Sequence, residues 1–123
     1  MSNNKTIGKL GEDAAADWLQ KEGHNILCRN WRGGRVEIDI VTSDEKGIHF
    51  VEVKSRRAPV AADPVVNVGY RKQQHLQAAA LKWLHTQKGL PKQEVFFDII
   101  TVIFDKTDTT INYYPQAFIP IYV

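Results

Sequence analysis

Four charged side chains lie within two short segments whose other residues are mostly apolar: Glu37, Asp39, Glu52 and Lys54. Strands that are buried in a protein normally exclude charge, so these groups need partners of opposite charge or a bound cation. Two carboxylates on neighbouring strands can share a divalent ion, and such an ion can activate water for attack on a phosphate. The four residues therefore outline a metal-dependent phosphodiesterase site.

The turn between the two segments decides whether the charged groups meet. A hairpin that turns symmetrically at residues 45–46 places Asp39 opposite Glu52. The same register places Glu37 opposite Lys54, and all four side chains then share one face. The opposite face gathers the apolar side chains Ile38, Ile40, Val51 and Val53. A bulged type I turn would shift the pairing by one residue and mix charge into both apolar surfaces, so we prefer the unshifted register or a compensating bulge.

In this register each residue has a candidate role. Opposed Cβ atoms are roughly 4.5–5.5 Å apart, which suits two carboxylates, Asp39 and Glu52, that share one cation. Oxygen ligands favour Mg²⁺ or Mn²⁺ over zinc. Lys54 could orient the attacking water or offset charge on the transition state. Glu37 is a further ligand or a partner of Lys54, and Glu12 could reach the sheet from the flank of the first helix.

Each of these residues also has a purely structural interpretation. The acids and the lysine could form cross-strand ion pairs on a solvated face, although Ile48 and Phe50 share that face. Glu12 could simply face solvent. Asp98 interrupts an apolar segment, and we expect it to be a structural hydrogen-bond acceptor or ion-pair partner rather than a metal ligand. The histidines form no recognisable ligand spacing: His24, His49, His75 and His85.

Basic and polar side chains flank the acidic segments and open the second helix. Those that could contact nucleic acid are Arg32, Arg35, Arg56, Arg57, Arg71, Lys72 and Gln73. Clustered cations can follow a phosphate backbone, but they also solvate ordinary protein surface. The formal net charge of +2 is too small to indicate a polyanionic partner by itself.

Hydrophobic periodicity predicts the elements that position these residues. Helical spacing predicts helices over residues 5–20 and 70–88, and apolar runs predict strands over 25–31, 35–42, 48–55, 95–104 and 111–114. The segment 57–68, which contains two prolines, is expected to be a loop. The order αβββαββ predicts an α/β sandwich with a central mixed sheet of about five strands, flanked by two main helices.

Composition indicates one globular domain over residues 1–123, because the chain is 43% hydrophobic and 24% charged. Cys28 is the only cysteine, so an internal disulfide is excluded. We find neither a secretory leader nor a long apolar segment, and we therefore expect a cytoplasmic protein without a membrane partner.

The acidic motif carries a family resemblance. Asp39 followed by Glu52-Val53-Lys54 resembles the PD-(D/E)XK signature of the restriction-endonuclease-like superfamily. The ordered set resembles the YraN-like uncharacterised bacterial family, related in fold to archaeal Holliday junction resolvases, and comprises Gly8, Gly11-Glu12, Ala15, Leu19, Gly23, Ile26-Leu27, Asn30-Trp31-Arg32, Glu37-Ile38-Asp39, Phe50 to Lys54 and Phe97 to Ile100. The resemblance implies a nuclease-type fold with Glu12, Asp39, Glu52 and Lys54 as the site. Val36 departs from the pattern, since these proteins generally carry glycine there.

Three classes of function follow. The first is a Mg²⁺-dependent endonuclease; the resemblance implies double-stranded or branched DNA as its substrate. The second is a catalytically inactive adaptor that binds nucleic acid. The third is a protein-interaction module that uses the apolar terminal segment 113–123. A substrate with two-fold symmetry would be a reason to expect a homodimer.

Overall fold

The computed structural model describes residues 3–59 and 68–118. Along the chain it contains helix α1 (Asn3–Lys21), strands β1 (Asn25–Gly33), β2 (Val36–Asp44) and β3 (Gly47–Arg57), helix α2 (Tyr70–Thr86), and strands β4 (Glu94–Phe104) and β5 (Thr109–Phe118). The strands form one sheet in sequence order, antiparallel except between β3 and β4. Parallel strands need a crossover connection, and α2 lies within it. The predicted fold class is confirmed.

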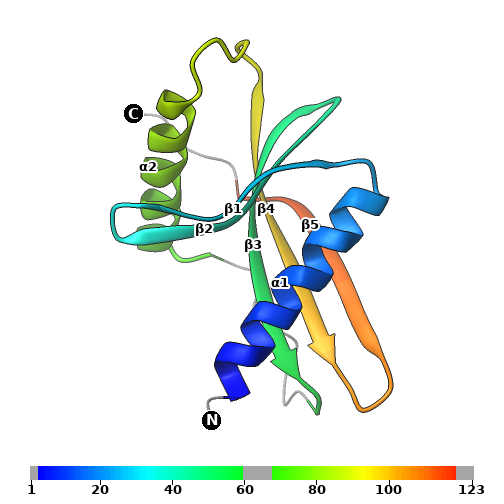
Figure 1. The fold of residues 1–123 in the computed structure, drawn as a ribbon. Helices are drawn as coiled ribbons and strands as arrows, with labels where there is room; N and C mark the ends of the chain where they lie inside the picture. Colours follow the sequence, from blue (N-terminus) through cyan, green and yellow to red (C-terminus); the bar gives the residue numbers. More distant parts are fainter. Residues whose placement is uncertain (1–2, 60–67, 119–123) are drawn as a thin grey trace.

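The two helices cover opposite faces of the sheet (Figure 1). One hydrophobic cluster joins α2, through Leu76 and Trp83, to Phe50 of β3. The other joins α1, through Leu19, to Val51 of the same strand. Neighbouring residues of a strand point to opposite faces, so β3 contributes to both clusters.

The β2–β3 hairpin has the unshifted register. Asp44 pairs with Gly47 across a two-residue turn. The Oδ1 atom of Asp44 accepts hydrogen bonds from the backbone amides of Lys46 at 2.9 Å and of Gly47 at 3.2 Å. Gly47 has φ +151°, and a Cβ there would lie 2.2 Å from the carbonyl oxygen of Glu94. Glycine is therefore required where β3 begins beside β4.

Strands β2 and β3 separate before they reach the predicted acidic pair. Their pairing ends at Ile40 and Val51, one position before Asp39 would face Glu52. Beyond that point β2 continues only beside β1. Ile38 packs in the α2 cluster while Ile40 packs in the α1 cluster. The expectation that these two isoleucines share a face is wrong, because the alternation of side chains breaks where β2 leaves β3.

Helix α1 approaches β3 closely at Gly11. A Cβ at this position would lie 1.8 Å from Oγ and 2.8 Å from Cβ of Ser55. By contrast, a Cβ at Gly8 would meet no atom within 4 Å. The absence of a side chain at Gly11 thus allows α1 to lie against the strand that carries Glu52 and Lys54.

Two predicted segments lie partly outside the described residues. These are the loop 57–68 and the terminal segment 113–123, for which residues 60–67 and 119–123 are not described. Within the described part, β5 extends to Phe118, whose ring stacks on Phe97 with centroids 4.7 Å apart. Phe118 therefore packs within its own chain. Among the described residues, neither helix is long and apolar enough to cross a membrane.

Candidate active site

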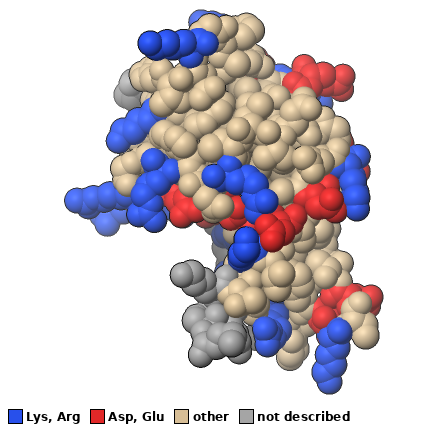
Figure 2. Space-filling model, viewed as in Figure 1, with Lys and Arg blue, Asp and Glu red and all other residues tan. Residues whose placement is uncertain are grey.

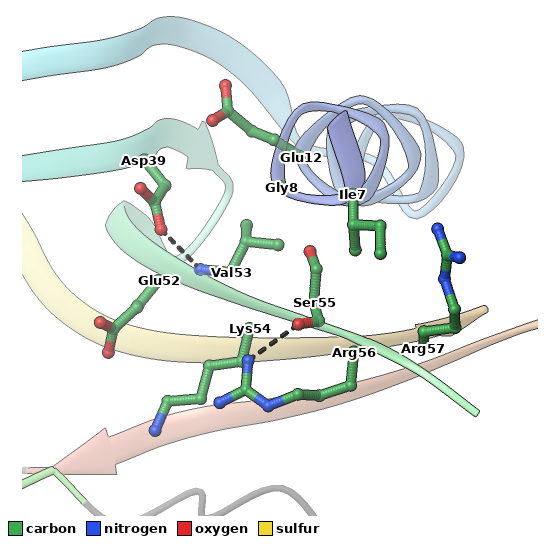
Figure 3. A pocket seen from close by; sticks show the side chains of 10 residues that line it. All are labelled: Ile7, Gly8, Glu12, Asp39, Glu52, Val53, Lys54, Ser55, Arg56 and Arg57. Carbon is green, nitrogen blue, oxygen red and sulfur yellow. Dashed lines mark hydrogen bonds between the residues drawn. The ribbon is translucent and has the colours of Figure 1, made fainter. Parts of the chain in front are cut away.

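Three of the predicted acids and the lysine lie around the fork between β2 and β3. They border a cavity of about 660 Å³ whose lining includes Glu12, Asp39, Glu52, Lys54, Arg56 and Arg57. Figure 3 shows Glu52 and Lys54 leaving β3 on one side while Ser55 leaves it toward α1. The cavity is lined from both faces of β3 because β2 has separated from it. Six of the predicted site residues are thus brought together.

Asp39 is the most strongly perturbed carboxyl group of this site. Its Oδ2 atom accepts a 2.8 Å hydrogen bond from the backbone amide of Val53 (Figure 3). Burial raises the pKa of Asp39 to about 7 against the opposing effect of that hydrogen bond, and the negative charges of Glu52, Glu12 and Glu37 add to the rise. A carboxyl group in this environment holds its proton to a higher pH than a free carboxyl group does, unless a cation neutralises the neighbouring acids.

Glu52 forms an ion pair with a residue of α2. Its Oε1 atom lies 3.2 Å from Nζ of Lys72, in the first turn of that helix. The Glu52 side chain is 19% exposed and the Lys72 side chain is 48% exposed. A lysine this exposed gains at most about 1 kcal/mol from such a pair, so a divalent cation can displace it. Lys72 is therefore placed at the edge of the site rather than sealed within it.

Glu12 is held from β1. Its Oε1 atom accepts hydrogen bonds from Nε of Arg29 at 3.1 Å and from Nδ2 of Asn30 at 2.8 Å. Arg29 also bonds Asp13, which raises the pKa of the guanidinium and lowers that of the Asp13 carboxyl. Asn30 adopts φ +55°, a conformation that asparagine tolerates better than most residues. Sequence reasoning missed both partners, since nothing in their spacing links them to Glu12.

Glu37 is less central than the other predicted acids. Its carboxylate lies 3.7 Å from the guanidinium of Arg32, and 38% of its side chain is exposed. It does not line this cavity, although its charge contributes to the raised pKa of Asp39. The structure therefore pairs Glu37 with Arg32 instead of Lys54.

The predicted nucleic-acid contacts surround the acids unevenly. Figure 2 shows lysine and arginine side chains beside a band of acidic side chains across the middle of the visible face. Arg56 and Arg57 line the cavity, whereas Arg35 and Arg71 are simply exposed. Gln73 donates a 2.6 Å hydrogen bond to the carbonyl oxygen of Val68. Its side-chain amide therefore supports the start of α2 in this structure.

The side chains at this cavity have the donor chemistry that suits a hard divalent cation, although the ligand atoms of Glu12, Asp39 and Glu52 do not all lie within 4.8 Å of one another. Three carboxylates on three elements and one lysine border a single cavity. Mg²⁺ and Mn²⁺ prefer oxygen ligands, and no histidine or cysteine lines this cavity among the described residues. Bringing several acids into a partly buried space is unfavourable unless positive charge is supplied. Asp39 and Glu52 are the residues that would hold the ion, with Glu12 beside them.

A solved structure to which this chain is similar is that of Pyrococcus furiosus SfsA in complex with Ca²⁺. The match has a TM-score of 0.41 and 18% sequence identity, and it covers 92% of this chain and 64% of that one.

Sequence comparison gives a closer relationship. A UPF0102 protein of Trichlorobacter lovleyi is 42% identical over 117 residues, which are 94% of this chain and 91% of that protein. A UPF0102 protein of Treponema pallidum is 37% identical over 119 residues, 94% of each chain. Residues 11–102 match the family model described as uncharacterised protein family UPF0102. The expected YraN-like family is confirmed, and the chain belongs to UPF0102.

Proposed function

We propose that this protein is a Mg²⁺- or Mn²⁺-dependent endonuclease that hydrolyses phosphodiester bonds in DNA. The observation that carries the proposal is the meeting of Asp39, Glu52, Glu12 and Lys54 around one cavity. The raised pKa of Asp39 supports it, because burial and neighbouring acids leave a group that a cation would stabilise. Active sites are a common place for such perturbed groups.

Each residue of the site has its own role in this proposal. Asp39 and Glu52 would hold the ion, which would supply Lewis acidity to the phosphate and to the attacking water. Lys54 donates hydrogen bonds to the phosphate oxygens on which negative charge develops. Glu12, oriented by Arg29 and Asn30, directs the water by accepting a hydrogen bond from it. Glu37 lies at the margin, where its negative charge would favour a bound cation.

Positive charge at the cavity supports a nucleic-acid substrate. Arg56 and Arg57 line the cavity, and Lys72 stands at its edge. Further candidate backbone contacts are Arg32, Arg35, Arg71 and Gln73. Contacts of this kind position a phosphate backbone without reading sequence. We therefore favour recognition of DNA shape, as in double-stranded or branched DNA, and a two-fold-symmetric junction would engage a homodimer.

A second candidate is a nucleic-acid-binding adaptor without catalytic activity. The ion pair between Lys72 and Glu52 favours it, since an ammonium group there already balances one of the acids. In that case the basic residues bind DNA, and the acids no longer recruit a metal ion. The two candidates predict opposite effects of Mg²⁺ and of substitutions at the acids.

Cleavage assays separate the candidates. Wild-type protein is incubated with labelled duplex, single-stranded and four-way-junction DNA in Mg²⁺, in Mn²⁺ or in EDTA. We expect metal-dependent cleavage that Asp39→Asn and Glu52→Gln abolish. Glu45→Gln, which changes an exposed acid in the hairpin turn, serves as the matched control and should cleave like wild type. Equal cleavage by Asp39→Asn would exclude this site. Salt-sensitive binding without cleavage, unchanged by Glu52→Gln, would establish the adaptor instead.

A further inference from the structure

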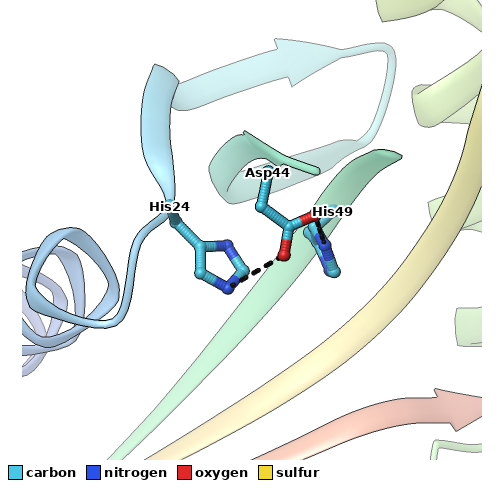
Figure 4. A group of neighbouring side chains, drawn as sticks. All are labelled: His24, Asp44 and His49. Carbon is cyan, nitrogen blue, oxygen red and sulfur yellow. Dashed lines mark hydrogen bonds and ion pairs between the residues drawn. The ribbon is translucent and has the colours of Figure 1, made fainter. Parts of the chain in front are cut away.

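A second polar cluster lies beside the β2–β3 turn, next to the start of β1. His24, Asp44 and His49 come together there (Figure 4). One ligand atom from each lies within 4.8 Å of those from the other two. The histidines are only 8% and 4% exposed. The spacing of these residues along the chain matches no compact ligand motif, and it is the fold that brings His24 and His49 together beside Asp44.

Both imidazole rings direct Nε2 toward the Asp44 carboxylate. The Nε2 atom of His49 lies 2.9 Å from Oδ1, and that of His24 lies 3.7 Å from Oδ2. The other ring nitrogens have separate partners. Nδ1 of His24 lies 2.7 Å from Oγ1 of Thr42, and Nδ1 of His49 lies 2.6 Å from Oδ2 of Asp98. Metal-binding histidines are commonly oriented in this way, with the second nitrogen bonded to an oxygen.

Asp98 is itself held firmly. It is 2% exposed and accepts hydrogen bonds from the hydroxyl of Tyr113 at 2.5 Å and from the backbone amide of Gln116 at 3.0 Å. The predicted role of Asp98 as a structural acceptor is thus confirmed. Its position behind His49 resembles the carboxylate that supports a metal-bound imidazole.

The cluster is separate from the acid cavity. It borders a cavity of about 540 Å³, which shares no lining residue with the cavity at the fork. The groups that face the two rings include two carboxylates, and burial opposes the protonation of His24, lowering its pKa. Hydrogen bonds with Asp98 and Asp44 outweigh burial at His49 and raise its pKa.

We propose that His24, Asp44 and His49 form a second metal site, suited to Zn²⁺. Two imidazole nitrogens and one carboxylate oxygen are a donor set typical of zinc, with a fourth position left for water, whereas Mg²⁺ prefers oxygen alone. Tetrahedral zinc ligands lie about 3.3 Å apart. The two Nε2 atoms now lie 2.9 Å and 3.7 Å from the Asp44 carboxylate oxygens, so only small shifts are needed when the ion binds. Through His24, the ion links the start of β1 to Asp44 and His49 of the β2–β3 hairpin, and this link stabilises the fold.

Metal titration of the full chain tests this site. Protein freed of metal by a chelator is titrated with Co²⁺, followed by visible absorption, and Zn²⁺ is then added in competition. We expect one Co²⁺ with the spectrum of a tetrahedral N/O site, displacement by Zn²⁺, and a higher Tm with Zn²⁺. His24→Gln should weaken binding at least tenfold, while His85→Gln, at an exposed position on α2, should not.

Three results would overturn the proposal. These are the absence of saturable Zn²⁺ binding, equal binding by His24→Gln and wild type, and loss of binding in Asp39→Asn, which would place the ion at the fork. If His24→Gln does not fold, Thr42→Val removes only the hydroxyl that orients His24. That variant should bind Zn²⁺ more weakly than wild type, and unchanged affinity would contradict the site. All of these binding measurements can be made whether or not the protein has nuclease activity.

Discussion

The two ends of the β2–β3 hairpin bury charge in different ways. At the turn, acids alternate with imidazoles, and Asp44 and Asp98 each hydrogen-bond His49. At the fork, acids meet acids, and burial with like charge raises the pKa of Asp39 to about 7. A cluster with nitrogen and oxygen donors suits a borderline cation, whereas carboxylates alone suit a hard one. Under the two proposals above, one hairpin would carry two sites with different metal preferences.

Loss of a carboxylate at the fork should have the largest effect. Asp39→Asn should lower the cleavage rate by at least about two orders of magnitude, because the amide cannot replace the charged ligand. Zn²⁺ binding at the turn should be unchanged. The comparison would fail if the same substitution removed both metal-binding signals in calorimetric titrations with Mn²⁺ and Zn²⁺.

Adding a methyl group where α1 lies against β3 should have the next largest effect. Gly11→Ala places a methyl group against Ser55, and overpacking of this kind typically costs about 1–3 kcal/mol. Gly8→Ala is the matched control on the same helix, since its methyl group meets no atom within 4 Å. It should be neutral or stabilising by about 0.5–1 kcal/mol. Urea unfolding measures both, and equal stability of the two variants would contradict the close approach.

The pH dependence of stability should distinguish the fork from the turn. Folding raises the pKa of Asp39 from 3.8 to about 7, so the folded chain keeps a proton that the unfolded chain has lost in this window. The free energy of unfolding therefore falls as pH rises from about 4 to 7, by about 1.4 kcal/mol for each unit of pKa shift. Asp39→Asn removes this loss. Urea titrations in EDTA should show that the free energy of unfolding of the variant rises relative to that of wild type as pH rises from about 4 to 7. A difference between the two proteins that does not change with pH would refute the assignment.

Removal of the ammonium group at the edge of the fork should have the smallest effect. Lys72→Ala frees Glu52 from its ion pair, which is worth at most about 1 kcal/mol, so Mg²⁺ affinity should rise by no more than about fivefold. Affinity for DNA should fall, because one contact to phosphate is lost. Lys82→Ala, an exposed change further along α2, is the control. Weaker Mg²⁺ binding by Lys72→Ala would show that the lysine supports the site.

Local patterns in the sequence were sufficient for the order of elements and the hairpin register. The turn at residues 45–46 sets the pairing because Asp44 bonds the turn amides and only glycine fits at position 47. The pairing itself ends at Ile40 and Val51, so the strand acids border one cavity without facing each other across the ladder. Motif order in the sequence pointed to Glu12 but not to its partners.

The sequence could not reveal what depends on long-range geometry. The alternation of side chains predicts a continuous ladder, yet β2 leaves β3 after Ile40 to follow β1. The hydrogen bonds from Arg29 to Glu12 and the meeting of His24 with His49 join residues from separate elements. Such contacts form only when the helices and strands pack together, so no local sequence pattern predicts them.

The most direct test of the central claim is anomalous diffraction from crystals soaked in Mn²⁺. We predict a peak between the carboxylates of Asp39 and Glu52, with Nζ of Lys72 displaced from Glu52. The absence of a peak there at saturating Mn²⁺, with Lys72 still paired to Glu52, would contradict a metal-dependent site at the fork.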